Sequence, residues 1–285
     1  MSSVAAIAGY ALRESVRRKV FVIVAILTVG FLSLYGLGTW RAFKDTQGFV
    51  GQNPGGLDTK TLTGATVLGL SMFATLFLGT VLAVFLTLGA VRGDAERGLL
   101  QPLLVRPVSR PALLLARFLA AASVCIAYVV VVYAGAVIIT GETGGWWPDR
   151  IVVPGIELAG AVTILVALSL LGSVFLSATA NGIAVFMVFG AGLVAGLLGQ
   201  IGRTIQSDTL KNIGTVSSWA LPFEALYQDA LHLITADSSG FTRFALQLGP
   251  FGGAQVGGPG LRVWAVGFLF VFGALAVAGF ARRDL

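Results

Sequence analysis

The residues best suited to specific chemistry lie in segment 92–117, the most charged interruption of a strongly apolar sequence. The segment opens with a mixed acidic and basic run that contains Asp94, Glu96 and Arg97 and ends at Gly98. Charges of both signs within a few residues suit the docking of another protein. An ordinary basic cytosolic loop is the alternative interpretation, since short loops rich in arginine are common there.

The sequence predicts a short amphipathic helix after this charged run. Its apolar residues have spacings of one, three and four, which place them on one face, and they are Leu99, Leu100, Leu103 and Leu104. The exit contains Arg106, Pro107, Arg110 and Pro111, so two prolines stiffen it. We therefore interpret residues 92–111 as a docking element at a membrane surface.

Catalytic and metal-binding motifs are missing from the sequence. The phosphate-binding pattern G-x-x-x-x-G-K-[ST] does not occur, and neither does G-x-S-x-G. With one histidine, His232, and one cysteine, Cys125, a zinc site or an internal disulfide is not expected. No ionisable residue lies deep in a predicted span, although Glu157 and Arg262 lie near span ends. We expect neither an enzyme nor a self-powered carrier.

The composition is that of an all-α integral membrane protein. Of 285 residues, 56% are hydrophobic and 11% are charged, and the mean hydropathy is +0.89. A single domain, 1–285, is expected, with apolar stretches long enough to cross a bilayer. The six predicted spans are 20–40, 66–91, 113–140, 155–177, 182–201 and 261–281. In the fifth span, the spacing Gly192-x-x-x-Gly196, with Gly199 beyond it, predicts close helix packing, more often within the chain than between two copies.

The segments between the spans have distinct expected roles. Residues 1–19 predict an amphipathic helix that lies on the inner membrane surface. Residues 41–64 predict a polar loop, residues 178–181 a tight turn, and residues 202–260 a long outer loop. An even number of spans places both termini on one side of the membrane.

Charge and aromatic residues both indicate that this side is the cytosol. The termini and the 92–117 segment carry a net charge of +7, whereas the remaining charged residues sum to −1. Basic residues concentrate in cytosolic segments. All five tryptophans fall on the other side, several at span ends, as in an interfacial belt: Trp40, Trp146, Trp147, Trp219 and Trp264.

The outer loop contains a second amphipathic helix. Pro222 suits its first position, and Glu224 suits its first turn. Apolar residues then recur at helical spacing: Phe223, Leu226, Tyr227, Ala230, Leu231 and Ile234. The polar residues Glu224, Gln228, Asp229 and His232 are expected to face the exterior. The helix either packs over the bundle at the outer surface, or gates the exit and receives a secreted partner.

The 92–111 segment resembles the loop between the second and third spans of type-2 ABC transporter permeases. Their pattern, E-(K/R)-G-T-L-x-x-L-L-x-R-P-V-S-R, is similar to residues 96–110. Leu99 stands where the family often has threonine, and Pro102 lies inside the expected helix. The likeness extends over nearly the whole chain. It is closest to the permeases that include the one serving nitrous-oxide reductase copper-site maturation.

The resemblance implies a role that the residues alone do not give. The loop would be a coupling helix that binds a separate ATPase, with ATP and Mg held by that partner and no cofactor in this chain. Two ATPase subunits and a second permease copy would complete an exporter in a bacterial or archaeal inner membrane. The bilayer is the other expected partner, and no nucleic acid is expected. A membrane anchor or assembly factor that recruits a partner without transport remains an alternative, and the substrate stays open.

Overall fold

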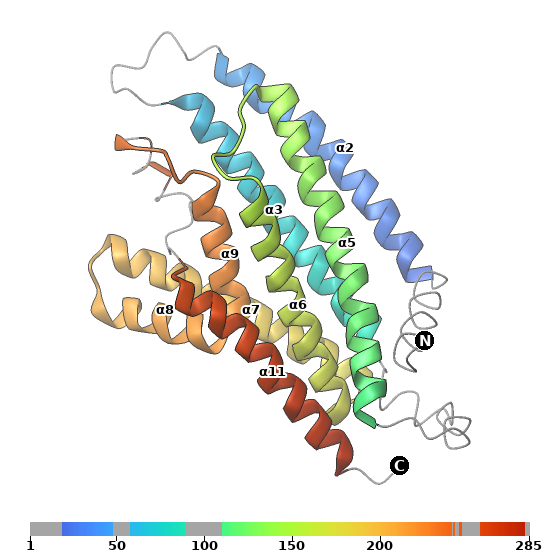
Figure 1. The fold of residues 1–285 in the computed structure, drawn as a ribbon. Coiled ribbons are helices and arrows are strands. Elements are labelled where there is room, and N and C mark those ends of the chain that lie inside the picture. The colour runs from blue at the N-terminus through green and yellow to red at the C-terminus, as the bar shows by residue number, and fades with distance from the viewer. Residues whose placement is uncertain are drawn as a thin grey trace.

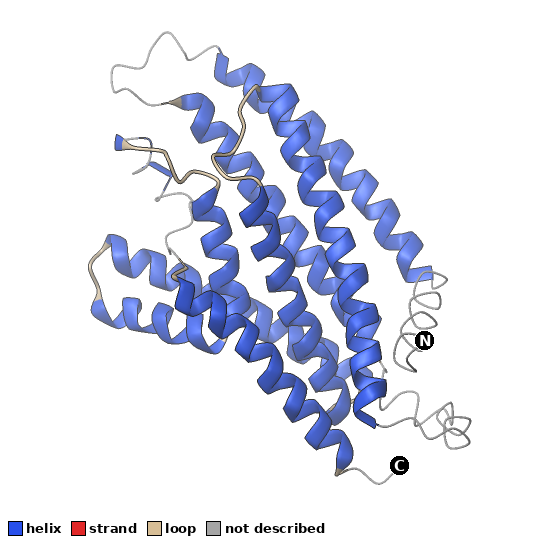
Figure 2. Ribbon diagram, in the orientation of Figure 1, coloured by secondary structure: helices blue, strands red, loops and turns tan. Residues whose placement is uncertain are grey.

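The computed structural model describes residues 19–47, 58–88, 110–240, 242, 245–246 and 257–282, and these residues form helices joined by short connections (Figures 1 and 2). No strand occurs among them. The predicted all-α fold is confirmed. The amphipathic helix expected at 1–19, except for Lys19, and most of the docking loop at 92–111 lie outside the described residues.

In the described part of the chain, six helices are long and apolar enough to cross a membrane, as predicted. Their bounds are α2 Lys19–Gln47, α3 Thr59–Thr87, α5 Arg110–Gly144, α6 Val152–Phe175, α7 Ala178–Thr204 and α11 Pro259–Ala281. In Figure 1 the start of α2, the start of α5 and the end of α11 lie at the same end of the bundle. We call this the inner end and the opposite one the outer end, after the orientation that the sequence predicts.

Two helix starts differ from the sequence-based boundaries because side chains cap them earlier. The Asp58 carboxylate accepts from the backbone N–H of Lys60 at 3.1 Å and of Thr61 at 3.2 Å, so α3 begins at Thr59 instead of 66. The tight turn expected at 178–181 is wrong, because those residues are already helical. Ser177 is the cap, and the turn between α6 and α7 is only Leu176 and Ser177.

The core lies where α3, α5 and α6 meet, and α2 packs on its outside against α5 (Figure 1). Leu68, Leu76, Val132, Leu158 and Leu165 are fully buried there. Hydroxyl pairs also link neighbouring helices: Thr87 to Ser169 at 2.6 Å, and Tyr35 to Thr140 at 2.6 Å. In lipid, such packing and hydrogen bonds replace the hydrophobic effect as the main force between helices.

Two shorter helices follow α7 and turn the chain back into the bundle. Helix α8, Asp208–Ala220, runs antiparallel along α7, and a Cβ at Gly199 would lie 2.8 Å from the Cα of Gly214. Helix α9, Pro222–Leu233, then returns to the outer end, where the N–H of Asp149 donates to the carbonyl of Ile234 at 3.2 Å. The helix predicted to begin at Pro222 is confirmed.

Candidate functional site

Helix α9 is buried along almost its whole length. Every residue from Pro222 to Leu231 is buried between α6, α7, α8 and α11. The prediction that its polar face meets the exterior is wrong for Glu224, Gln228 and Asp229, whose exposed fractions are 1%, 4% and 0%. Of the four polar residues expected to face the exterior, His232 alone is partly exposed. The reason is that neighbouring helices cover the polar face: α7 lies against Glu224, and Arg262 of α11 binds Asp229.

Glycines on α7 create the space for this helix. A Cβ at Gly192 would meet the ring of Phe223 at 2.6 Å, and a Cβ at Gly196 would overlap the carboxyl group of Glu224. The Phe223 ring also stacks on Phe189, with centroids 6.0 Å apart. The spacing Gly192-x-x-x-Gly196, with Gly199 beyond it, therefore serves packing within the chain, as the sequence predicts.

Glu224 lies in this tight space without a hydrogen-bond partner on either carboxylate oxygen among the described residues. Burial raises its pKa to about 7, and the neighbouring Gln228 side chain and the positive charge of Arg203 act in the opposite direction. Burial also raises the pKa of the adjacent Tyr227 hydroxyl. A buried acid without a hydrogen-bond partner is costly when ionised, so the arrangement favours the neutral form of Glu224 up to about pH 7.

A second acid on α9 is fully paired. Arg262, in the first turn of α11, donates from Nη2 to Oδ2 of Asp229 at 2.7 Å and from Nε to Oε1 of Glu157 at 2.8 Å. The N–H of Gly257 donates to the other carboxylate oxygen of Asp229 at 2.7 Å. This cluster ties α6, α9 and α11 together near the outer end. Buried carboxylates require such pairing.

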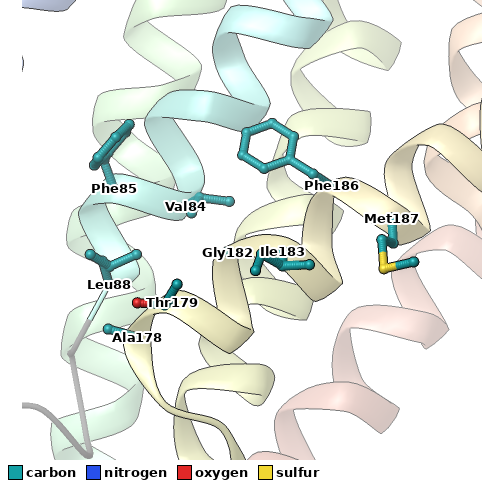
Figure 3. Close-up of a pocket in the computed structure, with 9 residues that line it drawn as sticks. All are labelled: Val84, Phe85, Leu88, Ala178, Thr179, Gly182, Ile183, Phe186 and Met187. Carbon is teal, nitrogen blue, oxygen red and sulfur yellow. The ribbon is translucent and has the colours of Figure 1, made fainter.

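An apolar groove of about 520 Å³ lies between the inner halves of α3 and α7 (Figure 3). Its nine lining residues are Val84, Phe85, Leu88, Ala178, Thr179, Gly182, Ile183, Phe186 and Met187. Thr179 is the only one with a polar side chain. The groove therefore suits an apolar occupant, either a lipid chain, a hydrophobic cargo or another helix.

The two predicted sites are described to different extents. Of the docking residues, Asp94, Glu96, Arg97, Gly98, Leu100, Leu103, Leu104, Arg106 and Pro107 lie outside the described residues. Arg110 begins α5 at the inner end. The outer-site residues Pro222, Phe223, Glu224, Leu226, Tyr227 and Asp229 all lie on α9. No group of three or more potential metal-binding His, Cys, Asp or Glu side chains occurs in the described part of the chain.

The sequence matches the family model for the ABC-2 family transporter protein over residues 5–285. The chain belongs to the ABC-2 transporter family. This match spans both the helical bundle and the segment expected to dock an ATPase, and no curated protein sequence matches the chain. As a member of the ABC-2 family, it is a multi-pass permease component of an ABC transporter, and the family implies a partner ATPase subunit.

The pairing of Glu157, Asp229 and Arg262 was missed at the sequence level. The three residues are far apart in the chain, and α9 was placed outside the bundle. One signal was available: Glu157 and Arg262, of opposite charge, both fall near the outer ends of predicted spans. Charged groups in such places usually pair with one another.

Proposed function

We propose that this ABC-2 family chain is the permease subunit of an ATP-driven exporter, with both termini in the cytosol of a bacterium or archaeon. A separate ATPase, in two copies, binds residues 92–111 and supplies ATP and Mg. The family match over residues 5–285 is the observation that carries this proposal. The absence of a phosphate-binding loop from the sequence fits an external energy source.

The location of the flanking helices supports docking at 92–111. Helix α3 ends at Thr87 and α5 begins at Arg110, and these two ends lie at the inner end of the bundle. A force applied between them would act on α3, which borders the groove of Figure 3, and on α5, which belongs to the core. We also propose that this chain is similar to the permeases that include the one serving nitrous-oxide reductase copper-site maturation.

Charge reversal in the docking segment tests the proposal. Glu96→Lys and Arg97→Glu should abolish co-purification with the ATPase or uncouple ATP hydrolysis from transport, while the protein still inserts. Arg150→Glu, an exposed charge at the outer end, is the matched control and should retain both. An exposed ion pair is worth only about 0–1 kcal/mol, so a large loss requires a docked and partly buried contact. Unchanged coupling in both docking variants would leave the loop as a linker and favour the membrane anchor.

A second permease copy would pack on the exposed face of α7. This face carries apolar side chains at helical spacing with exposed fractions of 41–70%: Ile183, Met187, Val194, Leu197 and Ile201. Two copies joined there would bring their α3–α7 grooves near each other and enclose a path for cargo. In a Cys125→Ala background, Met187→Cys should cross-link between copies in membranes. Phe270→Cys, 75% exposed on α11, should not, and equal cross-linking of both would count against this interface.

Helix α9 is proposed as the outer gate of this path. It lies beside the outer half of α7, sealed by the contacts of Phe223 and Glu224 with glycines of that helix. Its other end carries Asp229, which Arg262 ties to α11. Movement of α7 during the ATPase cycle would therefore act directly on α9. A secreted partner at this outer surface remains part of the proposal.

A further inference from the structure

Arg262 has donors to spare after it pairs with two buried acids. A guanidinium carries five N–H groups. Its Nε–H donates to Glu157 and one Nη2–H donates to Asp229. Arg262 makes no other side-chain hydrogen bond among the described residues. The Arg262 side chain is 44% exposed, whereas those of Glu157 and Asp229 are 4% and 1% exposed. The acids therefore fix the guanidinium from the inside, and its remaining donors are available to an outside acceptor.

An apolar groove leads away from this guanidinium along α6 and α11. It has a volume of about 260 Å³, and Arg262 itself forms part of its wall. Glu157, whose Oε1 accepts from Arg262, also lines it. The remaining lining residues are apolar and include Ile156, Gly160 and Ile164 on α6, and Val266 and Leu269 on α11. From Arg262 to Leu269 the helix rises by about 10 Å. The groove is thus long enough for the upper part of an acyl chain, and its apolar walls suit one.

The depth of this site in the bilayer is indicated by tryptophan. Trp264 Nε1 donates to the carbonyl of Trp219 at 2.7 Å, and the two rings lie 6.4 Å apart at the outer start of α11. Tryptophans concentrate at the level of lipid headgroups. Arg262 lies only two residues before Trp264, so its free donors are at the height of headgroup phosphates while the groove points toward the hydrocarbon.

We propose that this site binds one glycerophospholipid of the outer leaflet, with its phosphate on Arg262 and an acyl chain in the α6–α11 groove. A guanidinium suits a phosphate because its planar donors match the phosphate oxygens. Two carboxyl groups face one guanidinium, so the cluster has no net positive charge with which to hold an anionic headgroup. The lipid's own ammonium therefore compensates its phosphate, and the headgroup is zwitterionic. The lipid stays bound in the site, where it bridges α6 and α11 beside Leu226 of α9.

Native mass spectrometry of the purified full chain tests this assignment. The probes are phosphatidylethanolamine, phosphatidylglycerol and diacylglycerol with identical palmitoyl and oleoyl chains. We expect one phosphatidylethanolamine to remain bound per chain. Phosphatidylglycerol should bind more weakly, and diacylglycerol, which lacks the phosphate, should bind about tenfold more weakly, as the loss of a charge-assisted hydrogen bond predicts.

Lipid binding is also tested with two substitutions that fill the groove and with a control substitution outside it. Val266→Trp and Ile156→Trp add bulk from opposite walls at positions that are 55% and 64% exposed, so the fold tolerates them. Each should weaken phosphatidylethanolamine binding at least about tenfold. Val263→Trp, at a position that is 73% exposed on the same helix but outside the groove, should leave it unchanged. Unchanged binding in both groove variants, an equal loss in Val263→Trp, or equal binding of diacylglycerol would overturn the site. Equal or tighter binding of phosphatidylglycerol would overturn the zwitterionic assignment.

Discussion

The carboxyl group of Glu224 on α9 occupies the space that a Cβ at Gly196 on α7 would need. The acid is 1% exposed, so α7 and α9 cannot approach this closely with any larger residue at position 196. One glycine thus decides where α9 lies. Helix α9 also contacts α6, α8 and α11, so the position of α9 affects the packing of the outer half of the bundle.

Replacing this glycine should therefore displace α9. We expect Gly196→Ala to lower the free energy of unfolding by about 1–3 kcal/mol, the usual cost of overpacking a core. Gly190→Ala is the matched control on the same helix, because a Cβ there meets nothing within 4 Å. It should be neutral or stabilise the helix by about 0.5–1 kcal/mol. Thermal unfolding in detergent measures both, and equal stability of the two variants would contradict the tight α7–α9 contact.

The raised pKa of Glu224 predicts that stability falls as the pH rises. Its ordinary value is 4.5 and its value in the folded protein is about 7. Below about pH 4.5 the acid is neutral in both states, so the folded protein is not penalised. As the pH rises to about 7 the unfolded chain releases this proton more readily than the folded one, and stability is lost by about 3 kcal/mol. Above the folded value the loss levels off.

Substitution separates this effect from other titrations. In the Glu224→Gln variant, the loss of stability between about pH 4.5 and 7 should disappear. At pH 8 this variant should be more stable than the unsubstituted protein. Glu142→Gln, an exposed position at the outer end of α5, should keep the pH profile unchanged. Arg203 and Gln228 are the charged and polar neighbours that limit the shift. A profile unaffected by Glu224→Gln would mean that this carboxyl ionises freely.

The ion cluster of Arg262 should also carry measurable stability. Arg262→Gln leaves the carboxylates of Glu157 and Asp229 buried without their partner, which we expect to cost about 3 kcal/mol. Arg150→Gln, at an exposed position, should cost less than about 0.5 kcal/mol. The triple variant Arg262→Gln, Glu157→Gln, Asp229→Asn should regain most of the loss, since it leaves no buried charge. The unfolding temperatures of the single variants and the triple variant are measured and compared. If the triple variant is no more stable than Arg262→Gln, the loss of stability comes from packing alone.

The sequence predicted the spans because a bilayer imposes a length and an apolarity that a single segment must satisfy alone. It also predicted the start of α9, since Pro222 and Glu224 are local helix signals. It did not predict the depth of α9. The spacing of apolar residues is the same whether the polar face of a helix contacts water or another helix. Here Glu224 contacts α7, and Asp229 is bound by Arg262 of α11.

Helix boundaries were missed for a related reason. Apolar content marks the membrane-embedded part of a span, whereas capping decides where the helix begins. The Asp58 cap extends α3 by seven residues into a stretch rich in threonine, which had the composition of a loop. The glycines of α7 gave the one correct tertiary signal, because Gly192-x-x-x-Gly196 predicted close helix packing and the structure supplies the partner.

Accessibility of α9 tests its proposed gating role. In a Cys125→Ala background, Gln228→Cys should resist an impermeant thiol reagent at rest, because position 228 is 4% exposed. Leu226→Cys, at 6% exposed, should behave alike. Ser239→Cys, at an exposed position after α9, should label at once and serves as the matched control. If α9 is the gate, ATP added with the ATPase subunit should make positions 226 and 228 reactive, since α7 must move away from the Phe223 and Glu224 contacts. Labelling of all three positions at the same rate without nucleotide would show that α9 is solvated, and protection that persists through active turnover would make it a fixed part of the core.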